Sequence, residues 1–288
     1  MLQVARLAPQ QLGEAGERVE RFYRARLNPD GGFQDRGGAS DLYYTVFGIE
    51  GLLALRAALP LGAIVSYLRG FGDGESLDFV HLTCLARAWA AMSPEARVEA
   101  PAEEILDRVE SYRSDDGGYA GDPSKQTGSA YQCFLALGAY QDLGRDMPRP
   151  GELATCLESL RAGDGGYANH PGGDVGLTTT TAAAVAVLRQ LGREPDPELA
   201  RWLLARLHRD GGFFAAPATP IPDLLSTATA LHALAVLQAD LGAVKEPCLD
   251  FLDTLWSSEG GFYGHWADDT LDCEYTYYGL LSLGHLSL

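Results

Sequence analysis

Two carboxylic acids, Asp272 and Glu274, stand two residues apart at the start of the last apolar run of the chain. Closely spaced carboxyl groups share a proton, which keeps one of them neutral near pH 7. A neutral carboxylic acid in a dry pocket donates protons well when hydrogen bonds support its conjugate base. The spacing therefore predicts that one acid of this pair can act as a general acid.

Aromatic residues are dense around this pair and in the first repeat of the chain. Ring faces attract cations, so a group of such rings stabilises positive charge that forms beside it. The aromatic residues expected to contact a ligand are Tyr43, Tyr44, Trp266, Tyr275, Tyr277 and Tyr278. Further ligand contacts are expected at Asp41, Asp78, His81, Tyr131 and Asp223.

Several of these acids have a structural alternative. Asp41, Asp78, Asp223 and Asp272 all precede a predicted helix, where aspartate is a preferred N-cap worth about 1 kcal/mol. Glu274 falls in a first helical turn, where an acid also suits the helix dipole. Capping and catalysis both remain open for these residues at the level of sequence.

Two other polar segments are interpreted as structural. His81 follows Asp78 by three residues, with Cys84 one turn further on, and we expect a hydrogen-bonded histidine there and no metal. The segment Asp268-Asp269-Thr270 is expected to be a solvated turn.

The glycines, which number 34 of 288 residues, indicate how the chain is organised around these side chains. An Asp-Gly-Gly-aromatic segment or close variant recurs with its first glycine at Gly31, Gly117, Gly165, Gly211 and Gly260, at spacings of 86, 48, 46 and 49. A degenerate copy, Gly72-Asp73-Gly74, lies within the double step. The sequence therefore contains a six-fold repeat.

Each repeat predicts a pair of helices. An amphipathic outer helix is expected to end at Asp-Gly-Gly, and an inner helix that is apolar on every side follows, as in 182–191, 226–241 and 275–288. Six such pairs in two layers predict an all-α fold, an α6–α6 toroid with an inner and an outer ring around a central hydrophobic cavity. Residues 1–288 are expected to form one such domain.

The repeats resemble those of protein prenyltransferase β subunits and squalene/terpene cyclases. The segment Gly31-Gly32-Phe33-Gln34-Asp35-Arg36-Gly37, followed by residues 41–52, is similar to a geranylgeranyltransferase β-subunit repeat. That resemblance implies an α–α toroid, a zinc site built from Asp-x-Cys and His, and an α-subunit-like protein partner. Asp223 matches the family aspartate, but the cysteine position is Leu225 and the histidine position falls on Tyr44 or Tyr275. We therefore expect no cofactor.

The terpene cyclase branch implies a different chemistry. Residues 272–276 resemble the acidic Asp-x-Asp-Asp-Thr motif whose middle acid protonates an alkene or epoxide, with Glu274 in the place of that acid. We therefore expect an enzyme that cyclises an isoprenoid or similar elongated apolar chain by acid initiation. Transfer of a prenyl group at an altered, zinc-less site and a non-catalytic lipid-binding or scaffold toroid are the two alternatives.

The composition excludes other classes of function. The net charge of −17 at pH 7 argues against nucleic acid, and also against a diphosphate donor. No apolar run reaches the roughly 18–20 residues that a membrane span requires. The five scattered cysteines are typical of reduced thiols, so a cytoplasmic location is expected.

Overall fold

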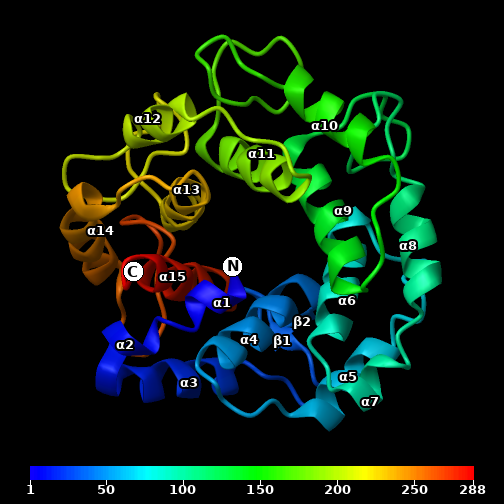
Figure 1. The fold of residues 1–288 in the computed structure, drawn as a ribbon. Coiled ribbons are helices and arrows are strands. Elements are labelled where there is room, and N and C mark those ends of the chain that lie inside the picture. The colour runs from blue at the N-terminus through cyan, green and yellow to red at the C-terminus, as the bar shows by residue number, and fades with distance from the viewer. The chain divides into compact units, whose positions relative to one another are not determined.

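The computed structural model describes residues 1–288, and most of the chain is helical (Figure 1). The chain divides into two compact units. The terminal unit comprises Met1–Pro60 and Pro197–Leu288, and the middle unit comprises Leu61–Asp196. None of the helices is both long and apolar enough to cross a lipid bilayer.

The terminal unit holds three pairs of outer and inner helices, in which α15 packs between α4 and α13 (Figure 1). Its first segment contains α1 (Leu2–Ala5), α2 (Pro9–Leu12), the 3₁₀ helix η1 (Gly13–Ala15), α3 (Gly16–Ala25), β1 (Phe33–Gln34), β2 (Ser40–Asp41) and α4 (Leu42–Ala54). Its second segment contains α12 (Glu198–Leu204), α13 (Leu224–Val236), α14 (Gly242–Leu255) and α15 (Cys273–His285). The antiparallel strands β1 and β2 pair Phe33 with Asp41 and Gln34 with Ser40.

The middle unit repeats this arrangement, with α9 packed between α6 and α11 (Figure 1). Its elements are α5 (Leu61–Arg69), α6 (Phe79–Ala90), α7 (Pro94–Arg97), α8 (Ala102–Glu110), α9 (Ala130–Asp142), α10 (Pro150–Ser159) and α11 (Thr178–Gln190). The inner helices α6, α9 and α11 alternate along the chain with the outer helices α5, α8 and α10, as the repeats predict.

The inner helices begin earlier than the apolar runs suggested. The helices predicted at 182–191, 226–241 and 275–288 are α11, α13 and α15, which start at Thr178, Leu224 and Cys273. Aspartate side chains set two of these starts, because Asp223 and Asp272 accept hydrogen bonds from backbone N–H groups three residues on. The polar first turn therefore belongs to the helix.

The prediction that the outer helices end at the Asp-Gly-Gly segments is wrong. These segments form tight turns a few residues beyond the ends of the helices. Helix α3 already ends at Ala25, and Leu27 then pairs with Phe33 across the turn. The same bridge recurs as Arg113 with Tyr119, Arg161 with Tyr167, Leu207 with Phe213, and Trp256 with Phe262. The first glycine of each of the five turns has a positive φ, between 84° and 96°, which glycine adopts without strain.

Threonines tie these turns to the inner helices. Thr45 Oγ1 accepts the N–H of Phe33 at 2.9 Å and donates to the carbonyl of Asp41 at 2.6 Å. The aromatic N–H groups of three other turns are accepted in the same way, Tyr167 by Thr181, Phe213 by Thr227 and Phe262 by Thr276. A buried backbone donor is thereby satisfied in each of these repeats.

A histidine pair lies inside the terminal unit, between α13 and α15. His232 Nδ1 and His285 Nε2 are 3.1 Å apart, and His285 is only 2% exposed. Burial lowers the pKa of His232 to about 3 and that of His285 to about 4. Both imidazoles are therefore neutral at pH 7.

We expect the melting temperature to fall as the pH is lowered from about 6.5 to about 4, because unfolded imidazoles bind protons that the buried pair does not. Each imidazole lowers the free energy of unfolding by up to about 1.4 kcal/mol per pH unit in this window. Thermal denaturation of the His285→Gln variant should show a shallower slope, and exposed His170→Gln should keep the original one. Equal slopes in the wild type and His285→Gln would contradict this account.

Candidate active site

A buried carboxylate, Asp272, caps the start of α15 and is 2% exposed. Its Oδ1 accepts the N–H of Tyr275 at 2.8 Å, and its Oδ2 accepts Nε of Arg36 at 2.7 Å. Burial raises the pKa of Asp272, although both hydrogen bonds favour its ionised form. Asp272 is thus a helix cap and, at the same time, one half of an ion pair.

Arg36 comes from the β1–β2 loop and also binds Asp268. Its two terminal nitrogens lie 2.9 and 3.3 Å from the Asp268 carboxylate oxygens. The guanidinium carbon is 5.3 Å from the centre of the Tyr275 ring, within range of a cation–π contact. Partial burial works against the charge of Arg36, but the hydrogen bonds with Asp268 and Asp272 raise its pKa above the ordinary value.

The predicted solvated turn at Asp268 is wrong. The Asp268 side chain is only 7% exposed, and it accepts the N–H groups of Gly264 and Thr270 as well as Arg36. Burial opposes ionisation there, but these hydrogen bonds hold the pKa of Asp268 below its ordinary value. The turn therefore presents a fixed negative charge to the start of α15.

Glu274 is half-buried and lies in the first turn of α15, two residues after the capping Asp272. Its Oε1 accepts the Tyr43 hydroxyl at 2.6 Å. Burial, aided by the charge of Asp272, raises the pKa of Glu274 to about 7, while Tyr43 and Arg36 pull it down. Since Asp272 is bound to Arg36 and Glu274 to Tyr43, the two acids are held by separate partners and not by a shared proton.

Aromatic rings from α4 and α15 adjoin Glu274. The ring of Tyr43 packs edge-on against Tyr44 at 5.6 Å and Phe47 at 5.0 Å between centroids. Phe47 in turn lies 5.7 Å from Tyr277 and 5.6 Å from Tyr278. These five rings form a continuous aromatic cluster that begins at the Glu274 carboxyl group.

Tyr44 of this cluster and Tyr275 beside Glu274 lie close to the same negative charges. Burial is the largest cause that raises the pKa of Tyr44 to about 12, followed by the charges of Asp272 and Glu274. Burial likewise raises the pKa of Tyr275 to about 12, with Glu274 as the next cause. Both hydroxyls stay protonated at pH 7.

The other candidates of the terminal unit have evident structural partners. Asp41 caps α4 by accepting the N–H of Tyr44 at 3.1 Å. Asp223 caps α13 through the N–H and the hydroxyl of Ser226, both at 2.7 Å, and burial raises the pKa of Asp223. Trp266 is 41% exposed and packs on His208 and Phe251 while its indole N–H donates to Thr254.

The zinc site of the prenyltransferase β subunits does not fit these residues. Asp223 is engaged by Ser226, Leu225 offers no ligand atom, and the histidine position is a tyrosine. Across residues 1–288, no three His, Cys, Asp or Glu side chains are grouped so that they could hold a metal ion.

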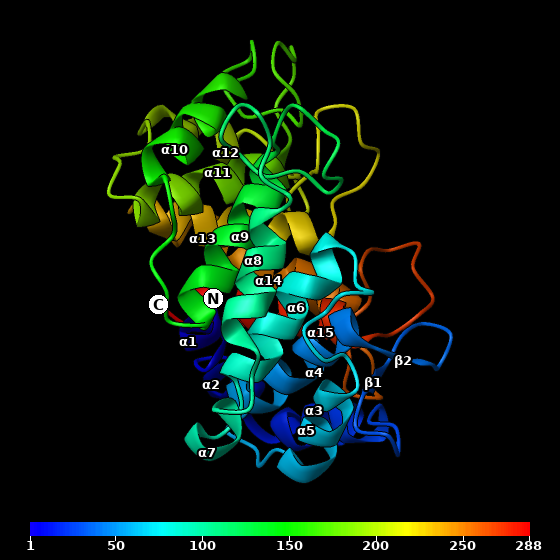
Figure 2. The same cartoon turned by 90° about the vertical axis from the view of Figure 1, so that its right-hand side faces the viewer.

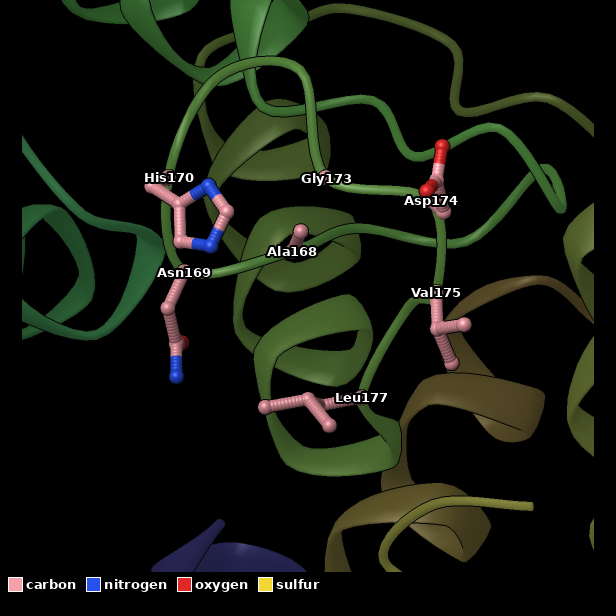
Figure 3. Close-up of a pocket in the computed structure, with 7 residues that line it drawn as sticks. All are labelled: Ala168, Asn169, His170, Gly173, Asp174, Val175 and Leu177. Carbon is pink, nitrogen blue, oxygen red and sulfur yellow. The ribbon is translucent and has the colours of Figure 1, made fainter. Parts of the chain in front are cut away.

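The middle unit carries the three remaining candidates. Asp78 caps α6, accepting the N–H of His81 at 2.9 Å and lying 2.9 Å from its Nδ1. Tyr131, at the start of α9, is 41% exposed. A hollow of about 370 Å³ opens to the surface beside the loop before α11 (Figure 3), and none of the candidates lines it: its walls are Ala168, Asn169, His170, Gly173, Asp174, Val175 and Leu177.

Three neighbours of Glu274 and Asp272 were missed from the sequence. Arg36 had a signal, because it lies in the segment 31–37 that resembles a family repeat, but that resemblance does not reveal what it binds. Asp268 had none, since its loop position is typical of a solvated acid. Phe47 had only the general signal of an apolar helix, although its ring joins Tyr43 to Tyr277 and Tyr278.

Comparison with known families identifies the family to which the repeats belong. Residues 15–68, 79–192 and 180–287 match the prenyltransferase alpha-alpha toroid domain. No curated protein matches the chain in sequence. The family match confirms the predicted all-α toroid fold class.

Solved structures with different activities are similar to the chain. Protein geranylgeranyltransferase-I of Candida albicans, complexed with GGPP, has a TM-score of 0.69 at 16% identity, over 93% of this chain and 90% of its own. The type II terpene cyclase MstE from Scytonema has a TM-score of 0.64 at 14% identity, over 96% and 98%. An inactive variant of an α-1,6-mannanase from Salegentibacter, with α-1,6-mannotriose, has a TM-score of 0.63 at 15% identity, over 96% and 98%. At such identities the likeness shows the fold alone, because one fold hosts several chemistries.

Proposed function

Because this chain belongs to the prenyltransferase alpha-alpha toroid domain family, we propose that it cyclises an isoprenoid chain by acid initiation. The observation that carries this proposal is the environment of Glu274, whose carboxyl group has a pKa of about 7 and adjoins a cluster of aromatic rings. A carboxylic acid that keeps a large protonated fraction at pH 7 and adjoins π systems has the two properties that alkene protonation needs.

In the proposed reaction, the Glu274 carboxyl proton moves to one carbon of a terminal alkene. A C–H bond forms from the π electrons, and a carbocation is left on the neighbouring carbon. The next alkene attacks that cation to close a ring, and loss of a proton to a base ends the sequence, so the product is an isomer of the substrate. Tyr43 stabilises the Glu274 carboxylate through its 2.6 Å hydrogen bond, while the rings of Tyr43, Phe47 and Tyr278 face the developing cation.

The charges around Glu274 favour a substrate without a diphosphate. Arg36 is the cation beside it, and its hydrogen bonds are directed to Asp268 and Asp272. The site therefore has a negative balance, which repels a diphosphate and stabilises a carbocation. This balance also disfavours prenyl transfer from a diphosphate donor.

The proposal is tested by incubating the protein with geranylgeraniol, squalene and geranylgeranyl diphosphate and analysing the products by gas chromatography–mass spectrometry. Acid-initiated cyclisation gives products of unchanged mass with fewer alkene protons in the NMR spectrum. Release of diphosphate, or transfer of the prenyl chain to a thiol, would instead support the prenyltransferase alternative.

Replacing Tyr43 by phenylalanine should shift the pH dependence of this activity. The hydrogen bond from Tyr43 stabilises the ionised form of Glu274. Its loss should therefore raise the pKa of Glu274 above 7 and move the alkaline limb of the rate profile to higher pH. The maximal rate should fall about tenfold, as expected for a lost hydrogen bond to a charged group. Tyr44→Phe is the matched control, and an unmoved limb in Tyr43→Phe would contradict the assignment.

A further inference from the structure

Arg36 joins two segments that are far apart in the sequence. It lies in the loop between β1 and β2, whereas its partners Asp268 and Asp272 lie 232 and 236 residues further along the chain. All three guanidinium nitrogens take part, at 2.7, 2.9 and 3.3 Å. The β1–β2 loop and the segment before α15 lie on the same side of the terminal unit (Figure 2).

Both segments are internally braced, so the contact joins two formed turns. In the β1–β2 loop, Asp35 Oδ1 accepts the N–H groups of Gly37 at 2.8 Å and Ala39 at 3.0 Å. In the other segment, Asp268 accepts the N–H groups of Gly264 and Thr270. When the hydrogen bonds of the Arg36 side chain break, the two turns can separate without either of them unfolding.

Arg36 covers the charges it binds. Its side chain is 39% exposed, while those of Asp268 and Asp272 are only 7% and 1% exposed. The guanidinium also lies over the ring of Tyr275, the residue that follows Glu274. Its outer side meets solvent and its inner side meets the start of α15.

We propose that Arg36 is a latch that holds the β1–β2 loop over the start of α15, and that release of this loop admits ligand and water to Glu274. The ligand half of this inference rests on the proposed function. Arg36 is a positioning residue in this scheme, because it acts through Asp272 and the loop and does not touch the alkene. Arg36 thereby controls the access of water to the Glu274 carboxyl group.

The titration of Glu274 reports on this closure, and several groups influence it. Tyr43 on α4, Asp272 before α15 and Arg36 on the β1–β2 loop act on Glu274 directly. Tyr44 and Tyr275 feel its charge, and they are also influenced by Asp41 and Asp223, respectively. Asp268 acts on Arg36 and Asp272. A variant used to follow the titration of Glu274 must therefore keep the positive charge of Arg36. Lysine keeps the charge and loses the forked geometry.

The experiment compares Arg36→Lys and Arg36→Gln by hydrogen–deuterium exchange, because both leave the hydrogen bonds within the two turns intact. Peptides spanning residues 34–41 and 264–272 should exchange about tenfold faster in both variants. Arg69→Gln is the matched control, since Arg69 makes a forked ion pair with Glu99 in the middle unit at 2.7 and 2.8 Å. Unchanged exchange in both peptides would overturn the latch.

Closure over Glu274 is measured by carbon-13 NMR of the glutamate carboxyl groups, with the Glu274 signal identified by its loss in Glu274→Gln. In Arg36→Lys the titration midpoint should fall by about one pH unit from its value near 7, because water reaches the carboxyl group. Faster exchange with an unmoved midpoint would overturn closure. Neither readout uses turnover, so inactivity towards isoprenoids would refute the proposed function and leave the latch standing.

Discussion

Replacing Glu274 by glutamine is expected to abolish cyclisation while the protein stays folded. The amide keeps the shape of the side chain and still accepts the hydrogen bond of Tyr43, but it has no acidic proton to give. General-acid catalysis contributes roughly 10²–10⁴-fold to rates, and alkene protonation has no substitute donor here, so we expect a loss of about 10³-fold or more. Product formation by gas chromatography–mass spectrometry measures it.

Stability separates a catalytic role of Glu274 from a structural one. Because the pKa of Glu274 is raised to about 7 in the folded protein, its ionisation costs stability as the pH rises from the unfolded value through 7. Glu274→Gln should therefore melt at the same temperature as the wild type or slightly higher at pH 8. A clear drop in melting temperature would indicate a structural role.

Glu103→Gln is a matched control for the chemistry. Glu103 is a surface acid that pairs with Arg145 and is 69% exposed, so its amide should leave the rate unchanged. The wild-type rate should also decline above pH 7, as Glu274 loses its proton. A Glu274→Gln rate above about a tenth of the wild type would rule out this residue as the acid.

The repeats made the helix pairs predictable, because periodic apolar positions and recurrent glycines are local signals. Their limits appear at Thr178, which starts α11 although threonine is a weak helix former. Tertiary contact decides there, since Thr181 one turn on accepts the buried N–H of Tyr167. Neither that bond nor the turn after each outer helix can be read from a single repeat.

The candidate site was only half predictable for the same reason. Asp272 and Glu274 are neighbours in sequence, so their placement at one helix start followed from the helix itself. What distinguishes them depends on residues more than 230 positions away, Arg36 for Asp272 and Tyr43 for Glu274. Contacts between residues so far apart leave no periodic pattern in the sequence. These contacts decide which acid forms an ion pair, whereas burial raises the pKa of the other.

The turn glycines allow a sharp comparison, because equivalent positions differ in what surrounds them. We expect Gly211→Ala to be strongly destabilising and Gly165→Ala to be mild. Both glycines have a positive φ, 86° at Gly211 and 91° at Gly165, so alanine pays about 1–2 kcal/mol of backbone strain at either. At Gly165 nothing lies within 4 Å of an added Cβ.

At Gly211 the added Cβ would lie 1.8 Å from the carbonyl oxygen of Pro247 in α14, and 2.5 Å from its carbon. Backbone inside a helix cannot move aside as a side-chain end can, so the turn and α14 must separate, at an additional cost of about 3 kcal/mol. At roughly 2–4 °C per kcal/mol, Gly165→Ala should melt a few degrees below the wild type and Gly211→Ala more than about 10 °C below it. Calorimetry of the two variants decides the matter: equal losses would mean that φ alone requires these glycines, whereas a large difference would show that close packing of the turn on the next outer helix requires glycine at Gly211.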